Sequence, residues 1–449
     1  AQMVSGTLAY AVGAGKAVVS TPYWHALEML ADGRGRLVPF HDHKAIAREI
    51  NQLLDCPEER LKVRRAAYDY SRPMVMKQMG RHYLELFSVA KAQRSRAVDL
   101  PPLNTLSQQE QRLPKINLSH LRLLTDDTGV LQHAKFTVPN REHGYCVDDN
   151  ARALIVVARA ADLNRGDISL YGLSSIYLSF LDAAFDPETG RFRNFMSYER
   201  QWLEDIGSED SHGRALWALG VMVGWGQNVG QVALATKLFH EALPALKDFS
   251  DSRAIAFPIL GMQAYLRRHD DDHQVRSLLE SLGNRLMERF RAFATKDWKW
   301  HEAELNYDNA RLPEALMACG RVTNNDDMVK TGIEVLEWLR EIDVDASNGW
   351  YAPVGNQGWF SKGGSKAQYD QQPLEAAAMI GASIEAFECT QREEWVQLAS
   401  TCFNWYLGQN DQQIQLYDFA GGGCRDGLMR NGVNENQGAE STLSYLCLL

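Results

Sequence analysis

The chain has 449 residues, of which 45% are hydrophobic and 23% charged, and its formal net charge is −10. This length allows more than one buried core, and roughly two to four domains are expected. The acidic balance and the lack of a local basic patch argue against binding to nucleic acid or to an anionic membrane. A neutral, hydroxyl-rich ligand suits this composition better.

The sequence gives no indication of export or of membrane insertion. No run approaches the roughly 18 apolar residues of a membrane span, and no charged-then-apolar leader opens the chain. The seven cysteines are odd in number and never form a CxxC pair. We therefore expect reduced thiols in a cytoplasmic protein. The opening Ala1-Gln2-Met3 runs directly into a buried-looking pattern, so we expect that the chain was cut from something longer.

Residues 1–92 are expected to form a partial α/β unit. An Ala- and Gly-rich helix ends at Gly15 and is followed by an apolar strand at residues 17–20. A second strand at residues 35–39 precedes a helix at residues 44–54. This alternation predicts a parallel sheet. Because two strands cannot make a stable doubly wound domain, the unit is predicted to be half of a Rossmann-like domain.

The same unit resembles the nucleotide-sugar-binding half of the group 1, GT-B-fold glycosyltransferases. The resemblance rests on residues 8–21 (LAYAVGAGKAVVST), on residues 33–39 (GRGRLVP) followed by Asp42, and on residues 45–54. In that family a Glu normally helps to hold the donor sugar at the position where this chain has Tyr10. The unit is therefore expected to bind no nucleotide sugar by itself.

Residues 93–124 are rich in proline and polar residues, which predicts a linker and a domain boundary. Beyond it, residues 125–449 repeat one pattern: an Asp- or Asn-rich turn, a small residue, often an Arg, and an apolar helix. The best pair of repeats shares Asp-Asn-Ala-Arg at residues 149–152 and 308–311. The predicted inner helices begin near Asp149, Ser211, Ser252, Asp308, Asp370 and Gln437.

Between these turns lie more polar, amphipathic helices, which belong on the outside, whereas almost wholly apolar helices belong inside. Six inner helices ringed by outer ones predict a six-hairpin α/α toroid (barrel), a mainly α fold preceded by the partial Rossmann-like unit. All inner helices should then start on one rim. One closing outer helix is unaccounted for, because the chain stops about a dozen residues into the sixth inner helix.

Over about 300 residues the pattern resembles the α/α-toroid carbohydrate enzymes, which include glycoside hydrolases of several families and the N-acylglucosamine 2-epimerase group. The stretch at residues 421–442, with its three glycines, is similar to the final active-site loop and helix of those hydrolases. The resemblance implies the architecture and a carbohydrate ligand. It does not single out a reaction or a catalytic pair.

Long loops rich in Gly and aromatic residues precede several of the turns. Loops of this length inside a compact domain are usually functional, and an aromatic ring is the surface on which a pyranose stacks. A single Trp is more often a core residue, but four Trp in such loops favour a sugar platform. The expected sugar-binding aromatics are Trp298, Trp300, Trp350, Trp359 and Tyr369.

Carboxyl groups at the turns are candidates for glycoside cleavage, which needs one protonated acid and one carboxylate. A helix N-terminus favours an ionised carboxylate, whereas an apolar loop raises the pKa of an acid. A single Asp is more often an ordinary helix cap, but these turns carry more carboxyl groups than capping needs. The candidate bases are Asp149, Asp308 and Asp370, and the candidate acids are Glu304 and, second, Glu440.

Arginines and histidines complete the expected site. An Arg at a constant offset after a turn can hold a carboxylate or a sugar hydroxyl, although it can equally tie neighbouring turns together as an ion pair. The histidines show no metal-ligand spacing, so neither a metal nor a cofactor is expected. The expected substrate-binding residues of this group are Asp148, Arg152, Arg214, Arg311, His212 and His301.

The leading hypothesis is a glycoside hydrolase or phosphorylase-like toroid that acts on a short oligosaccharide and is fused to a glycosyltransferase. One alternative is a glycosyltransferase whose toroid only binds glycan. Another is a sugar epimerase or isomerase in which His143, His212 or His301 moves protons next to a carbonyl. The pH optimum separates the classes, because histidines titrate near neutrality. The sugar, the linkage, the anomeric outcome and the oligomeric state stay open.

Overall fold

The computed structural model describes residues 4–95, 114–163 and 167–448. The chain folds into two compact units, residues 1–100 and residues 101–449, which are described separately. The predicted linker at residues 93–124 lies partly outside the described residues. None of the helices in the described ranges is both long enough and apolar enough to cross a membrane.

The first unit is a small α/β structure. Strands β1 and β2 pair in parallel, with Val19 opposite Arg36, and helix α2 connects them. Leu8 and Val12 of α1 pack with residues of α2 and α4 in a small core. This is the partial Rossmann-like unit that the sequence predicts. Its elements are α1 (Gly6–Gly13), β1 (Val19–Ser20), α2 (Trp24–Met29), β2 (Arg36–Leu37), α3 (His43–Asp55), α4 (Pro57–Ser71), η1 (Arg72–Met74) and α5 (Met76–Ser95).

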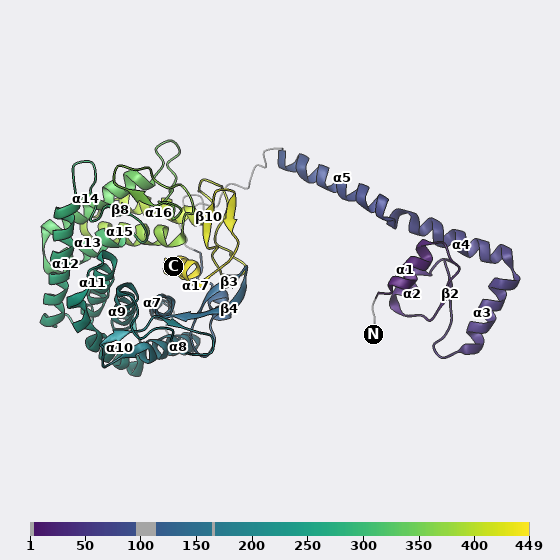
Figure 1. Ribbon diagram of the computed structural model, residues 1–449, viewed down its shortest axis with the longest axis horizontal. Helices are drawn as coiled ribbons and strands as arrows, with labels where there is room; N and C mark the ends of the chain where they lie inside the picture. Colours follow the sequence, from purple (N-terminus) through teal and green to yellow (C-terminus); the bar gives the residue numbers. More distant parts are fainter. Residues whose placement is uncertain (1–3, 96–113, 164–166, 449) are drawn as a thin grey trace. The chain divides into compact units, whose positions relative to one another are not determined.

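The second unit is a ring of helices (Figure 1). Each inner helix packs against the next, and α17 packs against α7, which closes the ring. The inner helices are α7 (Val147–Leu163), α9 (Glu209–Trp225), α11 (Ser252–Leu266), α13 (Arg311–Thr323), α15 (Pro373–Thr390) and α17 (Ala439–Leu446). The outer helices are α8 (Ile168–Ala184), α10 (Val229–Ala242), α12 (His273–Phe293), α14 (Asp326–Asp343) and α16 (Glu394–Tyr406).

Burial separates the two sets as the sequence pattern predicts. In α9 every residue from Ser211 to Val223 is buried, whereas α12 buries only one face. Glycines let two inner helices approach closely, because a Cβ atom at Gly220 of α9 would collide with the backbone of Gly261 in α11. The predicted α/α toroid is confirmed, and the short helix α6 (Ser119–Leu124), which falls in the predicted linker, packs against α17.

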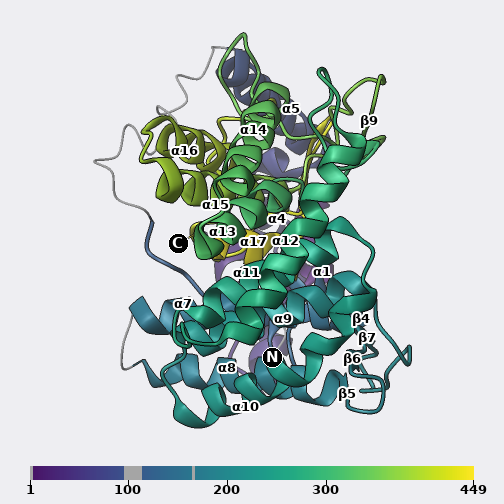
Figure 2. The ribbon, with the colours of Figure 1, turned by 90° about the vertical axis from the view of Figure 1, so that its left-hand side faces the viewer.

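Most segments that lead into an inner helix carry short strands. These are β3 (Leu131–Lys135), β4 (Val138–Cys146), β5 (Phe185–Asp186), β6 (Arg191–Phe192), β7 (Phe195–Met196), β8 (Glu304–Leu305), β9 (Phe360–Ser361), β10 (Gly427–Met429) and β11 (Gly432–Asn434), and a 3-10 turn, η2 (Leu243–Asp248), precedes α11. Strands β3, β4 and β7 form one antiparallel sheet. Strands β5 and β6, and likewise β10 and β11, form antiparallel hairpins, whereas β8 pairs antiparallel with β9, which follows it only after α13 and α14. Figure 2 shows β4 to β7 and β9 on one side of the ring.

The inner helices begin on this same rim, as predicted, because side chains in their first turns contact one another around the ring. Two helices start later than expected. Asp308 has a positive φ of 50°, outside the helical range, so α13 begins only at Arg311. Pro373 occupies the first position of α15, where the missing N–H costs nothing, so Asp370 lies in the preceding turn.

Candidate functional site

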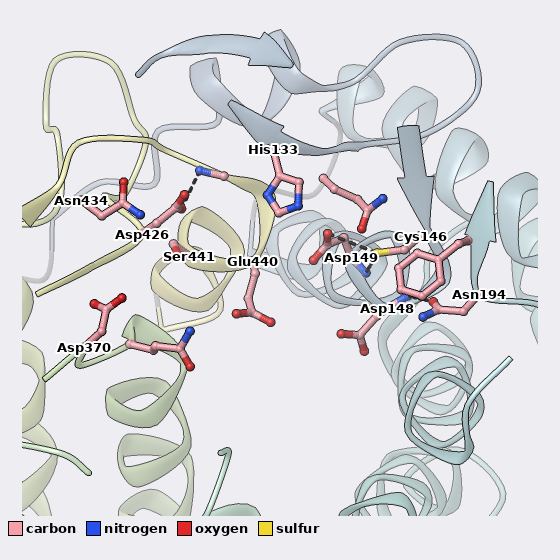
Figure 3. A pocket seen from close by; sticks show the side chains of 14 residues that line it. His133, Cys146, Asp148, Asp149, Asn194, Asp370, Asp426, Asn434, Glu440 and Ser441 are labelled. Carbon is pink, nitrogen blue, oxygen red and sulfur yellow. Dashed lines mark hydrogen bonds between the residues drawn. The ribbon is translucent and has the colours of Figure 1, made fainter. Parts of the chain in front are cut away.

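A pocket of about 340 Å³ opens at the rim where α7, α15 and α17 begin (Figure 3). Five carboxyl groups line it, contributed by both ends of the toroid sequence. We call it the rim pocket. Its lining residues are Gln132, His133, Cys146, Asp148, Asp149, Asn194, Phe195, Asp370, Gln372, Asp426, Asn434, Gly438, Glu440 and Ser441.

One wall of the rim pocket is the first turn of α7. Arg152 Nη1 lies 2.7 Å from Asp148 Oδ2 and 3.2 Å from Asp149 Oδ1. Its other nitrogen, Nη2, lies 3.0 Å from Oε2 of Glu440 in the first turn of α17. One guanidinium therefore joins three carboxyl groups, and closure of the ring brings Glu440 beside the start of α7. The i+3 and i+4 spacings within α7 make the first two contacts possible.

Asp149 and Asp148 are neighbours in sequence but differ in charge state. Burial raises the pKa of Asp149 to about 7, against the lowering effect of Arg152. The thiol of Cys146 donates a hydrogen bond to Asp149 Oδ2 over 3.2 Å. Burial acts on Asp148 as well, but the cations of Arg152 and Arg214 outweigh it and hold the pKa of Asp148 below its usual range. Near pH 7 Asp149 thus holds a proton for much of the time, while Asp148 is ionised.

The opposite wall carries Asp370 and Asp426 (Figure 3). Asp426 accepts a hydrogen bond of 2.7 Å from the backbone N–H of Gly438, and burial raises its pKa to about 6. Oδ1 of Asp370 is buried and has no hydrogen-bond partner among the residues that the structure describes, and burial raises the pKa of this carboxyl. A Cβ atom at Gly427 would lie 2.5 Å from Asp370 Oδ1, so glycine there leaves room for the carboxyl.

Asp308 lies below the rim pocket and is only 2% exposed. Its carboxylate is 3.0 Å from Arg214 Nη2 and 3.4 Å from Arg311 Nε, and these groups line a separate small cavity inside the ring. Glu375 of α15 accepts hydrogen bonds from the backbone N–H groups of Asp308 and Asn309. The predicted base Asp308 and the predicted sugar ligands Arg214 and Arg311 are therefore buried partners of one another.

Glu304 lies away from the rim pocket, in strand β8. Oε1 of Glu304 accepts a 2.7 Å hydrogen bond from the hydroxyl of Ser361, which belongs to the paired strand β9. The side chain of Glu304 is partly exposed, which differs from the apolar environment expected from the nearby tryptophans. The reason is that the indole rings of Trp298 and Trp300 are buried in the core, whereas Glu304 keeps contact with solvent.

The aromatic residues are not gathered around the rim pocket. Trp298 and Trp300 are 4% and 0% exposed, and their indole N–H groups donate to backbone carbonyls of Glu302 and Glu304. Both rings pack on Trp338, so the expectation of sugar platforms at these two positions is corrected to a core role. Trp350, Trp359 and Tyr369 are partly exposed on rim segments outside the lining of the rim pocket.

The histidines are likewise placed differently from the expectation of a substrate-facing group. His212 is fully buried between Phe192 and Phe249, and its Nε2 lies 3.0 Å from the carbonyl of Ala242. His301 is also fully buried, and burial lowers the pKa of both imidazoles to about 3. Both are corrected to core residues, because their imidazole rings are enclosed by aromatic side chains and do not reach the surface. His143 is exposed and contacts His133, which lines the rim pocket.

Sequence reasoning missed several residues of this region. Asp426 follows three glycines in the stretch that resembles the last active-site loop of toroid hydrolases, and this stretch could have pointed to it. Cys146 directly precedes α7, but only the fold shows that its thiol reaches Asp149. Glu375 looks like an ordinary first-turn residue of α15. Within the described ranges, no group of three or more His, Cys, Asp or Glu side chains is arranged to hold a metal ion.

Comparisons with known proteins identify the fold class. No protein-family model and no curated protein matches the sequence. Among solved structures, the chain is similar to a cellobiose 2-epimerase from Bacillus thermoamylovorans, with a TM-score of 0.58, 13% identity, and coverage of 74% of this chain and 95% of that chain. It is also similar to a GH76 α-mannanase from Bacteroides thetaiotaomicron, with a TM-score of 0.53, 11% identity, and coverage of 73% and 92%.

A third similar structure is the cellulase Cel9M of C. cellulolyticium in complex with cellobiose, with a TM-score of 0.51, 9% identity, and coverage of 72% of this chain and 86% of that chain. Identities this low establish a shared α/α-toroid architecture and nothing about the reaction. The function therefore has to be argued from the residues of the rim pocket.

Proposed function

We propose that the toroid is a carbohydrate-active enzyme that breaks a glycosidic bond in the rim pocket by carboxyl chemistry. The observation that carries this proposal is the shared contact of Arg152 with Asp149 and Glu440. One of these carboxyls has its pKa raised to about 7, and the other is a half-exposed carboxylate in an ion pair. A proton donor and an ionised partner beside one pocket are what glycoside cleavage requires.

In this proposal Asp149 donates the proton to the glycosidic oxygen. Its burial favours the neutral form, and the raised pKa lets it give up that proton near neutral pH. Glu440 then activates water or phosphate, or attacks the anomeric carbon. The roles are the reverse of those expected from the sequence, because burial outweighs the helix dipole at Asp149.

Two further carboxyls of the rim pocket, Asp370 and Asp426, are assigned to substrate binding. Asp370 and Asp426 face Asp149 across the pocket, and the free Oδ1 of Asp370 can accept a hydrogen bond from a sugar hydroxyl. Asp148 stays ionised between Arg152 and Arg214 and keeps Arg152 in position. Neutral sugars suit this lining, since it offers acceptors for many hydroxyl groups.

The epimerase alternative finds less support in the placement of the histidines. Proton transfer next to a carbonyl needs bases that titrate near neutrality. His212 and His301 are fully buried with pKa values of about 3. His133 is the histidine in the lining of the rim pocket, and its pKa is lowered by burial and by His143. Carboxyl chemistry is therefore the better-supported assignment.

The first unit is proposed, on its resemblance alone, to derive from the nucleotide-sugar-binding half of a GT-B glycosyltransferase. Tyr10, at the position of the family's donor-binding Glu, is 83% exposed on α1. We expect residues 6–88 to bind neither UDP- nor GDP-sugars in calorimetry. Micromolar binding of either would contradict this expectation.

The test uses the full chain against a panel of aryl glycosides and oligosaccharides, with and without phosphate, and Asp149→Asn and Glu440→Gln as variants. Each substitution should lower kcat by about 10²- to 10⁴-fold, because each removes one partner of the acid–base pair. Glu304→Gln is the matched control and should lose less than about tenfold. The alkaline limb of kcat/KM should fall near pH 7, where Asp149 loses its proton.

Several outcomes would contradict the proposal. If Glu304→Gln is inactive and Asp149→Asn is active, the acid assigned from the sequence is correct and the pocket assignment is wrong. Exchange of solvent deuterium into a reducing sugar, without glycoside cleavage, would support the epimerase alternative. Glycan binding that survives in calorimetry without any turnover would leave a non-catalytic binding module.

A further inference from the structure

A second pocket, of about 600 Å³, lies at the end of the ring opposite the rim pocket. Residues near the C-terminal ends of the inner helices α7, α9, α11 and α13 line it, together with residues of α15. We call it the basal pocket. Its lining residues are Arg159, Trp225, Gln263, Ala264, Leu266, Arg267, Arg276, Glu314, Arg321, Val322, Gly381, Ile384, Glu385 and Glu388.

Two carboxylates of the basal pocket, Glu314 and Glu385, already form ion pairs with arginines. Glu314 forms an ion pair with Arg311 inside the ring. Glu385 accepts hydrogen bonds of 2.8 Å from Arg321 Nε and 3.1 Å from Gln263 Nε2. The remaining carboxylate, Glu388, is exposed at the edge of the pocket. Among the described residues, these carboxylates form no ion pair with two of the other arginines of the basal pocket, although the charge of one of them, Arg159, acts on Glu314.

Arg159 and Arg267 are those arginines. Among the described residues neither makes an ion pair; both instead contact Trp225, with guanidinium carbons 5.7 and 4.8 Å from the centre of the indole ring. A cation–π contact leaves the N–H groups at the edge of the guanidinium free to donate. Two arginines beside one aromatic ring thus offer several hydrogen-bond donors to the basal pocket.

Helix C-termini attract cations, so arginines at this end of the ring have a simpler structural explanation. Arg276 fits that explanation, because it donates to the carbonyls of Val322 and Asp270. Arg268 does too, since it donates to the carbonyl of Gly226. Arg159 and Arg267 form no such hydrogen bond in the described part of the chain, so helix capping does not account for them.

We propose that the basal pocket binds a small organic phosphate. The planar guanidinium pairs with phosphate oxygens through two parallel hydrogen bonds, and Arg159 and Arg267 supply two such groups. The volume exceeds what inorganic phosphate alone needs and lies in the range of small-molecule sites. Trp225 and the half-exposed side chain of Ile384 offer apolar surface to the organic part of the ligand.

Calorimetry on the full chain tests this proposal, with glucose 6-phosphate and uridine monophosphate as probes and glucose as the uncharged comparison. At least one organic phosphate should bind at or below about 1 mM, and added salt should weaken the binding. The double variant Arg159→Ala/Arg267→Ala should lose at least tenfold in affinity. Arg268→Ala, an arginine at the same helix end that does not line the basal pocket, should bind as the parent does.

The controls decide between a site and general charge attraction. Loss of binding in Arg268→Ala as large as in the double variant would overturn the proposal, as would the absence of binding by both organic phosphates. Equally tight binding of inorganic phosphate would contradict the role given to Trp225 and Ile384. Because both substituted arginines reach the surface and form no ion pair with a described residue, circular dichroism and glycoside turnover should be unchanged in the double variant. This separates the test from that of the rim pocket.

Discussion

Two turns of the ring share the residues Asp-Asn-Ala-Arg, yet the fold uses them in different ways. At the start of α7, Asp149 lies within the helix and lines the rim pocket. Before α13, Asp308 has a positive φ, lies outside the helix and is buried between Arg214 and Arg311. The same four residues thus place one carboxyl in the lining of the rim pocket and the other in a structural ion-pair network. Their neighbours across the ring make the difference.

The largest expected effect is on catalysis and should separate the two aspartates. Asp149→Asn should lower kcat by about 10²- to 10⁴-fold, because it removes the proposed proton donor. Asp308→Asn should change the kcat of the folded protein by less than about tenfold, since Asp308 does not line the rim pocket. Steady-state kinetics on the same glycoside measures both, and an equal loss in the two variants would remove the functional distinction between these turns.

Stability should show the opposite ranking. Asp308→Ala leaves the buried guanidinium groups of Arg214 and Arg311 short of a partner, and breaking a buried pair in this way costs about 3–5 kcal/mol. Denaturation in urea, followed by circular dichroism, measures the change in free energy of unfolding. Arg200→Ala serves as the control, because its ion pair with Asp127 is exposed and screened by solvent, so its loss should change the free energy of unfolding far less.

The dependence of stability on pH should identify Asp149 as a carboxyl with a raised pKa. The folded state binds its proton more tightly than the unfolded state does, with a pKa of about 7 against an ordinary value of 3.8. The contribution of Asp149 to stability is therefore full below pH 4 and is lost as the pH rises toward 7. Asp149→Asn should gain in melting temperature relative to the parent over this window, and a constant difference would contradict the assignment.

The smallest expected effect concerns Cys146. Its thiol donates a hydrogen bond to Asp149 Oδ2, which favours the ionised form and lowers the pKa of Asp149. Cys146→Ala should move the alkaline limb of kcat/KM to higher pH, by less than about one unit. Cys146→Ser, with a stronger donor, should move the limb to lower pH. Shifts of the same sign in both variants would show that the thiol acts through packing alone.

Much of the architecture could be predicted from local patterns. The spacing of the turns and the contrast between wholly apolar and amphipathic helices predict an inner and an outer ring, and both are present. The parallel pair of strands in the first unit followed from two short apolar runs. Two helices begin later than the sequence predicts. The positive φ of Asp308 delays the start of α13 to Arg311, and α15 begins at Pro373 rather than at Asp370.

The site was predicted less well, and the reason lies in contacts between residues distant in sequence. The sequence of their turns points to Asp149, Asp370 and Glu440, and the structure brings all three to one pocket. Glu304 and the two buried tryptophans were grouped with them because they precede the same kind of turn. Position relative to a helix start predicts which rim a residue occupies, but not whether its side chain faces the opening, the core or the solvent.

The sequence by itself therefore determined the ring, its rim and the set of acidic turns, because periodicity and helix caps are local properties of the chain. The tertiary structure alone decided which carboxyls share a pocket and which of them keeps a proton. Those outcomes depend on Arg152 meeting Glu440 across the closure of the ring, and on Glu375 holding the turn at Asp308 from a neighbouring helix. Burial and charge at such contacts are set by residues far apart in the chain, and no local pattern records them.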